Sequence, residues 1–187
     1  MHRILIACIA LLFPLCPVNA KDDSFQQYQN YELPHYDTRS PLGNSGYWRG
    51  WIELESESWG RYCYAESLVA AARPIRLFFR SSWPRFYVRT IPKLKTRNEV
   101  VIHLAFTHHP KHSPVLTVGK EEFPLITQEK YAFLRDPATQ EKLIAAMRKN
   151  QKLFIRGIAA DGTKTEDEYE LRGAPEMLEA MQKECPL

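Results

Sequence analysis

The sequence has 187 residues and a formal net charge of +3 at pH 7, with 44% hydrophobic and 25% charged residues. A charge this close to neutrality excludes net charge as a reason to expect a nucleic-acid or membrane-surface partner. The length is sufficient for one hydrophobic core and too short for two full domains. We therefore expect a single domain and no nucleic-acid partner.

The first twenty residues have the three-part order of a secretory signal peptide. The basic residue Arg3 precedes an apolar stretch over residues 4–15, and a small-residue exit follows at Val18-Asn19-Ala20. We place the cleavage after Ala20. The mature chain would then have 167 residues and a net charge of +2.

Two other interpretations of this segment meet physical objections. A retained membrane anchor needs about 20 apolar residues, whereas this stretch is shorter and contains Pro14. A lipidated Cys16 needs small residues just before it, but Phe13-Pro14-Leu15 stands there. We therefore expect a mature chain without a transmembrane span in the periplasm, with secretion or outer-membrane association as further options.

Four cysteines are reduced to two by this cleavage, because Cys8 and Cys16 leave with the signal peptide. In an oxidising compartment, the remaining Cys63 and Cys185 are expected to form one disulfide. The chain-entropy model gives about 4 to 5 kcal/mol for closing so long a loop. The alternative is two separate buried thiols.

Residues 21–46 are polar and rich in turn-forming residues, and they have no apolar periodicity of either kind. We expect an amino-terminal extension here, with regular structure beginning near Tyr47. The folded domain would then cover residues 47–187.

Short runs of alternating apolar and polar residues follow, a pattern typical of half-buried strands. In residues 61–68, for example, Cys63 and Ala65 share one side of the expected strand. Asp161-Gly162 has the composition of a hairpin turn. The other expected strands are residues 47–55, 75–80, 86–91, 100–106, 115–118, 153–159 and 163–171. We therefore predict a mainly β, β-sandwich-like or barrel-like domain of about eight strands.

Two short helices are expected among these strands. The first covers residues 137–149, with Asp136 as its cap and a proline in its first turn. The second covers residues 174–184 and has an apolar face that ends at Cys185. Because Cys63 is on the side of its strand that could be buried, the two sulfurs could meet where this helix packs on the sheet.

Several short motifs occur in a recognisable order along residues 48–185. They are Cys63-Tyr64-Ala65-Glu66-Ser67, Asn98-Glu99-Val100, Ala145-Ala146-Met147-Arg148-Lys149, Gly157, Asp161-Gly162-Thr163-Lys164-Thr165, Tyr169-Glu170-Leu171-Arg172-Gly173 and Cys185. Together they resemble the invasion-associated locus B family, although Asn150, Asp161 and Glu170 depart from its usual residues. The resemblance implies an exported Gram-negative envelope protein of mostly β fold, associated in some members with host-cell entry. It implies no catalytic residues.

The cluster His108, His109 and His112 is the only concentration of imidazoles in the sequence. Imidazole nitrogens bind zinc or copper when a loop brings them together. Pro110 prevents a continuous helix from aligning the three rings, and no nearby cysteine or acid completes a tetrahedral set. We therefore expect a solvated hairpin tip and regard these histidines as weak metal candidates only.

Basic and aromatic residues alternate in the stretch from residue 76 to residue 97, which includes two short expected strands. Guanidinium groups bind phosphates and carboxylates through paired hydrogen bonds. A solvated surface is the competing interpretation. The candidate binding surface consists of Arg76, Phe78, Arg80, Arg85, Tyr87 and Arg89.

These features favour an exported, non-catalytic protein of the cell envelope that binds a protein or an anionic envelope or host-surface molecule. Its role would lie in envelope integrity or host-cell contact. A periplasmic ligand or metal carrier is the alternative, and a periplasmic enzyme is a third one. We expect no cofactor, and no oligomeric state follows from the sequence.

Overall fold

The computed structural model describes residues 39–56, 58–74 and 82–187, which all belong to one structural unit. The predicted signal peptide and the predicted strand over residues 75–80 lie outside the described residues. The same holds for Arg76, Phe78 and Arg80 of the candidate binding surface. No helix within the described ranges is long and apolar enough to cross a membrane.

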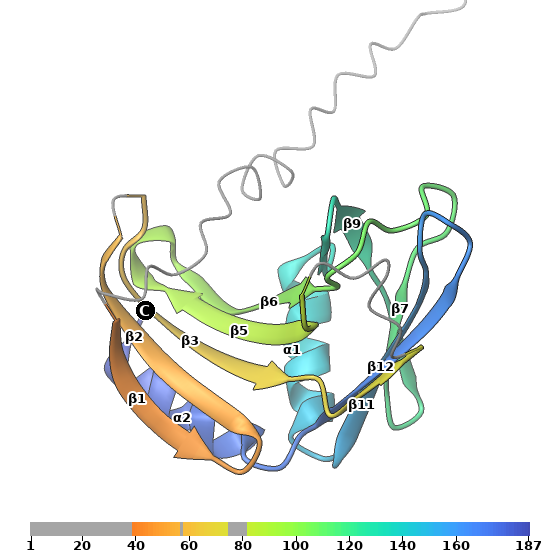
Figure 1. The fold of residues 1–187 in the computed structure, drawn as a ribbon. Helices are drawn as coiled ribbons and strands as arrows, with labels where there is room; N and C mark the ends of the chain where they lie inside the picture. The colour runs from red at the N-terminus through yellow and green to blue at the C-terminus, as the bar shows by residue number, and fades with distance from the viewer. Residues whose placement is uncertain (1–38, 57, 75–81) are drawn as a thin grey trace, which may run out of the picture. The chain divides into compact units, whose positions relative to one another are not determined.

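Two antiparallel sheets form the framework of the described residues (Figure 1). The larger sheet has seven strands in the order β1-β2-β3-β5-β6-β10-β9. These strands are β1 (Arg39–Ser45), β2 (Trp48–Ser56), β3 (Gly60–Leu68), β5 (Arg85–Ile91), β6 (Thr96–His103), β9 (Ile126–Gln128) and β10 (Tyr131–Phe133). A short 3-10 helix, η3 (Pro92–Leu94), connects β5 to β6.

The smaller sheet has five strands in the order β4-β12-β11-β7-β8. These strands are β4 (Ala71–Arg73), β7 (Val115–Val118), β8 (Glu121–Pro124), β11 (Lys152–Ile158) and β12 (Lys164–Glu170). Both sheets end in unpaired edge strands within the described residues, so the sandwich-like arrangement is the one observed. The mainly β fold class is therefore confirmed, with more strands than the eight expected.

The main hydrophobic core joins the two sheets and both helices. Trp48 of β2 and Tyr169 of β12 both contact Phe86 of β5, with ring centroids 5.8 Å apart in each pair. The indole Nε1 of Trp48 also donates a hydrogen bond of 2.9 Å to the carbonyl oxygen of Glu170. Aromatic rings and one indole hydrogen bond thus fix one sheet against the other.

The two predicted helices are confirmed as α1 (Pro137–Met147) and α2 (Ala174–Glu184). Asp136 caps α1, because its Oδ1 accepts a hydrogen bond of 2.9 Å from the backbone nitrogen of Thr139. That bond lowers the pKa of the Asp136 carboxyl. Inside α1, the side-chain Oε1 of Gln140 accepts a bond of 2.7 Å from the backbone nitrogen of Val100 in β6.

Helix α2 packs against β1, β2 and β3. Its start depends on Gly173, which has a φ of +96°, and an added Cβ would lie 1.8 Å from the carbonyl oxygen of Ser45. The predicted inward face of α2 is confirmed, because Leu178 and Met181 are fully buried. Cys185 follows the helix and is buried as well.

The expected disulfide is present and joins Cys63 of β3 to Cys185. The two Cα atoms are 6.0 Å apart, and the bond connects residues 122 positions apart in the chain. Since both cysteines are buried, the bond attaches the carboxy-terminal end of α2 to the inner face of the larger sheet.

The sequence-based expectations are wrong for several strands and for one strand boundary. Strand β1 lies within residues 21–46, which were expected to form an extension, so this prediction was wrong for residues 39–45. No alternation marks β1, an edge strand with a register shift between Pro41 and Gly43. Four strands of three or four residues, β4, β8, β9 and β10, were missed, whereas β7, which also has four residues, was predicted. In the expected strand 100–106, pairing ends at His103.

Candidate functional site

The side of β3 that faces away from the disulfide carries aromatic and charged residues. Ring centroids are 6.0 Å apart between Tyr62 and Tyr64, and 6.5 Å apart between Tyr64 and Tyr87 of β5. All three tyrosines are buried. Burial raises the pKa of Tyr64, and it raises the pKa of Tyr87 to about 12.

Arg89 of β5 lies on the same side of the sheet and forms an ion pair with Glu99 of β6. The two side chains are only 6% and 2% exposed. The Arg89 guanidinium carbon also lies 4.5 Å from the ring centroid of Trp59. The expected exposure of Tyr87 and Arg89 was therefore wrong, because Arg89 has a buried carboxylate and an aromatic ring as partners.

Glu66 of β3 is a second buried acid on this face, with a side chain that is 5% exposed. Its carboxylate accepts ion pairs from Arg49 at 3.1 Å and from Arg85 at 3.2 Å. Of the predicted binding residues, Arg85 is thus partly exposed and already paired. A buried charge is tolerated when such partners compensate its lost hydration. The described charged residues on this face therefore pair with one another.

The three histidines of the cluster differ in their surroundings. His108 is buried, its Nε2 accepts a bond of 3.2 Å from the backbone nitrogen of Ile158, and its Nδ1 lies 3.1 Å from the carbonyl oxygen of His109. Burial lowers the pKa of His108, which favours the neutral ring. His109 and His112 lie with ring centroids 4.8 Å apart. Within the described ranges, no group of three or more metal-binding side chains is present.

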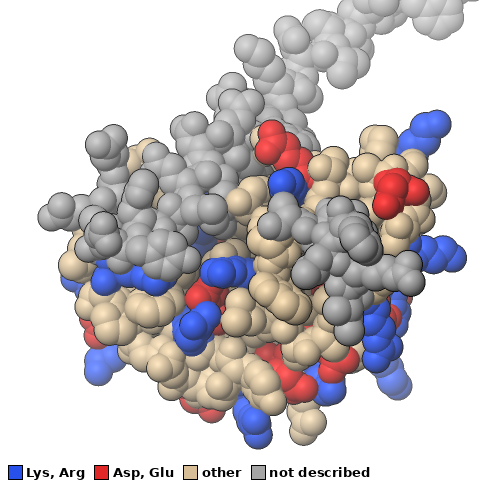
Figure 2. All heavy atoms as spheres, in the orientation of Figure 1, with Lys and Arg blue, Asp and Glu red and all other residues tan. Residues whose placement is uncertain are grey.

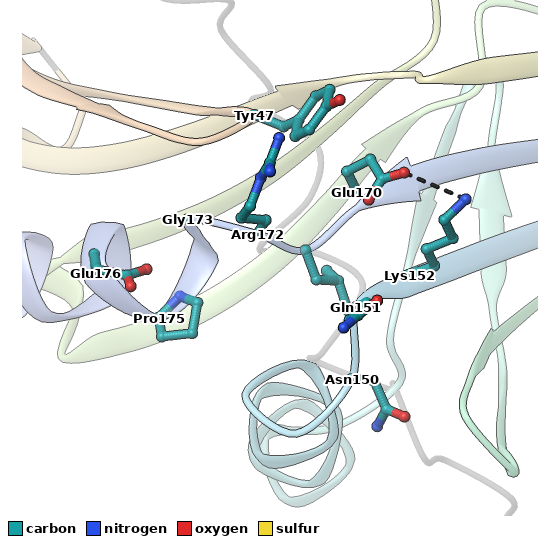
Figure 3. A pocket seen from close by; sticks show the side chains of 10 residues that line it. Tyr47, Asn150, Gln151, Lys152, Glu170, Arg172, Gly173, Pro175 and Glu176 are labelled. Atoms are coloured by element: carbon teal, nitrogen blue, oxygen red, sulfur yellow. Dashed lines mark ion pairs between the residues drawn. The ribbon is translucent and has the colours of Figure 1, made fainter.

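One pocket of about 580 Å³ opens where β12 leads into α2 (Figure 3). In this view the Arg172 side chain reaches toward the ring of Tyr47, and its guanidinium carbon lies 5.2 Å from the ring centroid. The Lys152 Nζ forms an ion pair of 3.3 Å with Glu170. The lining includes two cations, Lys152 and Arg172, and two carboxylates, Glu170 and Glu176. The described lining therefore has balanced charge.

A second pocket of about 780 Å³ opens at the other end of β11 and β12. Among its described lining residues, four carry a permanent positive charge and one carries a negative charge. We call this pocket the basic cleft; its charged and histidine residues are Arg73, Lys111, His112, Arg156, Lys164 and Glu166. The whole 187-residue chain has a net charge of only +3, and the cleft lining alone reaches this value.

This local excess contrasts with other parts of the surface. Figure 2 shows acidic and basic side chains interspersed in the lower middle of the face toward the viewer, whereas basic side chains predominate along its right-hand edge, on the side where Figure 1 draws β11 and β12. No sequence pattern predicted the basic cleft, because its cations come from four separate segments of the chain. Alternation in residues 153–159 places Arg156 on the side opposite Leu153 and Ile155, and this was the only available signal.

Comparison of the chain with models of known protein families, with curated protein sequences and with solved structures gives no significant match.

Proposed function

We propose that this chain is an exported, non-catalytic protein of the bacterial cell envelope with a binding or structural role in envelope integrity or host-cell contact. The observation that carries the proposal is the disulfide between Cys63 and Cys185. Disulfides persist in oxidising compartments and are rare in the bacterial cytosol. A disulfide at the centre of the fold therefore supports export, as does the signal-peptide pattern of residues 1–20.

A binding role is favoured over catalysis by the way the charged residues are used. The buried charges Glu66, Arg89 and Glu99 are engaged in ion pairs that join neighbouring strands. Some of the exposed charges line open pockets at the two ends of β11 and β12. A ligand carrier is the second candidate, because pockets of about 580 and 780 Å³ have the size of small-ligand sites.

The experiment is thiol trapping with amino-terminal sequencing of the full chain produced in a Gram-negative bacterium. Intact cells are treated with a thiol-alkylating reagent before lysis, and the protein is then mapped without reduction. We expect a chain that starts at Lys21 and contains a peptide linked through Cys63 and Cys185.

The matched control is Leu11→Arg, which places a charge in the apolar stretch that directs export. This variant should remain uncleaved in the cytosol, with the thiols of Cys63 and Cys185 both alkylated. A wild-type chain that starts at Met1 and has Cys63 and Cys185 both alkylated would contradict the proposal.

A further inference from the structure

The arginines of the basic cleft lie on three neighbouring strands of the smaller sheet, β4, β12 and β11, together with the glutamate between them. Arg73 of β4 pairs directly with Glu166 of β12, and Glu166 pairs with Arg156 of β11. Residues paired in this way place their side chains on the same side of a sheet. The Glu166 carboxylate lies 2.7 Å from the Nε of Arg156 and 3.6 Å from a terminal nitrogen of Arg73. One carboxylate thus orients two guanidinium groups.

The loop that completes the cleft is fixed to the end of β11. The backbone nitrogen of His109 donates a bond of 2.8 Å to the carbonyl oxygen of Ile158, whose own nitrogen donates to the His108 ring. The backbone nitrogen of Ala160 donates a bond of 2.9 Å to the carbonyl oxygen of Thr107. These bonds hold the side of the loop before Lys111, and the pairing of Val115 in β7 with Arg156 in β11 holds the side after it. Lys111 therefore stays next to the strands that carry the arginines.

The side chains of the cleft remain available to a ligand. The Arg73 side chain is 73% exposed and that of Arg156 is 59% exposed. Glu166 contacts one nitrogen of each guanidinium group, and a guanidinium group has five N–H donors. Lys111 and Lys164 are also exposed. In this part of the described chain, Glu166 neutralises one of four positive charges.

We propose that the basic cleft binds a phosphate group with more than one negative charge, as a phosphomonoester or an oligophosphate. Two oriented guanidinium groups match the oxygens of phosphate, and two lysines add positive charge. A phosphomonoester carries a charge of about −1.5 to −2 at pH 7, so it compensates the cleft better than a single carboxylate does. This inference deepens the proposed function, on which it rests, by naming the ligand class of the binding protein.

Two sources present the same phosphate chemistry, a soluble phosphate compound and a phosphorylated lipid headgroup. The first arm of the test therefore titrates inorganic tripolyphosphate into the purified mature protein, with isothermal calorimetry at low ionic strength. The second arm measures co-sedimentation with phosphatidylcholine vesicles that contain or lack phosphatidic acid. Binding in the first arm alone identifies a soluble ligand, and binding to phosphatidic acid vesicles identifies a lipid headgroup.

The variants Arg156→Ala and Lys111→Ala should each weaken binding in whichever arm is positive by about tenfold, because each removes a charge-assisted hydrogen bond. The matched control is Lys152→Ala, which removes an exposed lysine from the same strand, β11, at the charge-balanced pocket. This variant should retain the wild-type affinity. Circular dichroism spectra that match the wild type show that each variant is folded.

The proposal is overturned if the wild-type protein binds neither tripolyphosphate nor phosphatidic acid vesicles. It is also overturned if Lys152→Ala weakens binding as much as Arg156→Ala does, because the contact would then be diffuse attraction to any surface cation. Neither result affects the thiol-trapping experiment. A failure of this inference is therefore distinguishable from a failure of the proposed function.

Discussion

Each of the two sheets contains an arginine–glutamate pair whose members lie directly opposite each other on neighbouring strands. Arg89 of β5 is directly opposite Glu99 of β6, and Arg156 of β11 is directly opposite Glu166 of β12. Both pairs bond through the Nε of arginine and the Oε2 of glutamate. The exposed fractions are 6% and 2% for the first pair, against 59% and 29% for the second.

Burial therefore gives the same pair of residues different roles. A buried ion pair has lost its hydration, so the removal of one partner leaves an uncompensated charge inside the protein. An exposed pair contributes little to stability, because water and salt screen it. Its remaining donors are instead accessible to a ligand. We infer that the buried charges of the larger sheet are structural and that the exposed charges of the basic cleft serve binding.

The largest effect is expected when the buried pair is broken. Arg89→Ala leaves Glu99 buried without its guanidinium partner, and this should lower the free energy of unfolding by about 3 to 5 kcal/mol. Urea denaturation measures the change. The double variant Arg89→Met/Glu99→Leu removes both charges and should recover much of the loss. A loss below about 1 kcal/mol for Arg89→Ala would place this pair in the same class as exposed pairs.

Removal of the disulfide should have the next largest effect on the same sheet. Cys185→Ser releases the end of α2 from Cys63 of β3, and it should cost about 2 to 5 kcal/mol of unfolding free energy. Urea denaturation of the variant, compared with that of wild-type protein under reducing conditions, measures the cost. Equal stability of the oxidised wild type and the variant would refute a stabilising role for the bond.

Burial of the tyrosine cluster predicts a loss of stability at alkaline pH. Tyr87 has a pKa of about 12 in the folded state and an ordinary value of 10.0. The folded state therefore retains the phenol proton more strongly than the unfolded state does. The contribution of Tyr87 to the free energy of unfolding is fully present below pH 10 and is lost as the pH rises from 10 to 12. The expected loss is about 2 to 3 kcal/mol. Tyr87→Phe should show a smaller loss than the wild type over this interval, and identical slopes would contradict the assignment.

The smallest effect on stability is expected at the exposed pair. Arg156→Ala should change the free energy of unfolding by about 0 to 1 kcal/mol, because its side chain is mostly in water. Urea denaturation alongside Arg89→Ala gives the direct contrast. A loss near that of Arg89→Ala would mean that Arg156 has a structural role, contrary to the division proposed above.

Local signals explain which parts of this fold were predictable from the sequence. Asp136 and the proline after it mark the start of α1 within a few residues, and the apolar face of α2 indicated the burial of Cys185. Alternation located β3, and the further strand candidates 115–118 and 153–159 correspond to β7 and β11. Each of these features depends on residues that are close together in the chain, so the local sequence is sufficient to predict it.

Residues that act through distant partners were not predictable in this way. Alternation in β5 placed Arg89 on a polar side, but nothing in that stretch indicated that Trp59 and Glu99 would cover and pair with it. The basic cleft depends on the pairing of β4 with β12, which brings Arg73 next to Glu166 across more than ninety residues. Such long-range pairing leaves no local periodicity.

The most direct test of this division is a nuclear magnetic resonance titration of the isotope-labelled mature protein with tripolyphosphate. We expect chemical-shift changes at Lys111, Arg156 and Lys164, and none at Arg89 and Glu99. Chemical-shift changes centred on β5 and β6, with the cleft residues unaffected, would contradict this division of roles. They would indicate that the binding surface lies on the larger sheet.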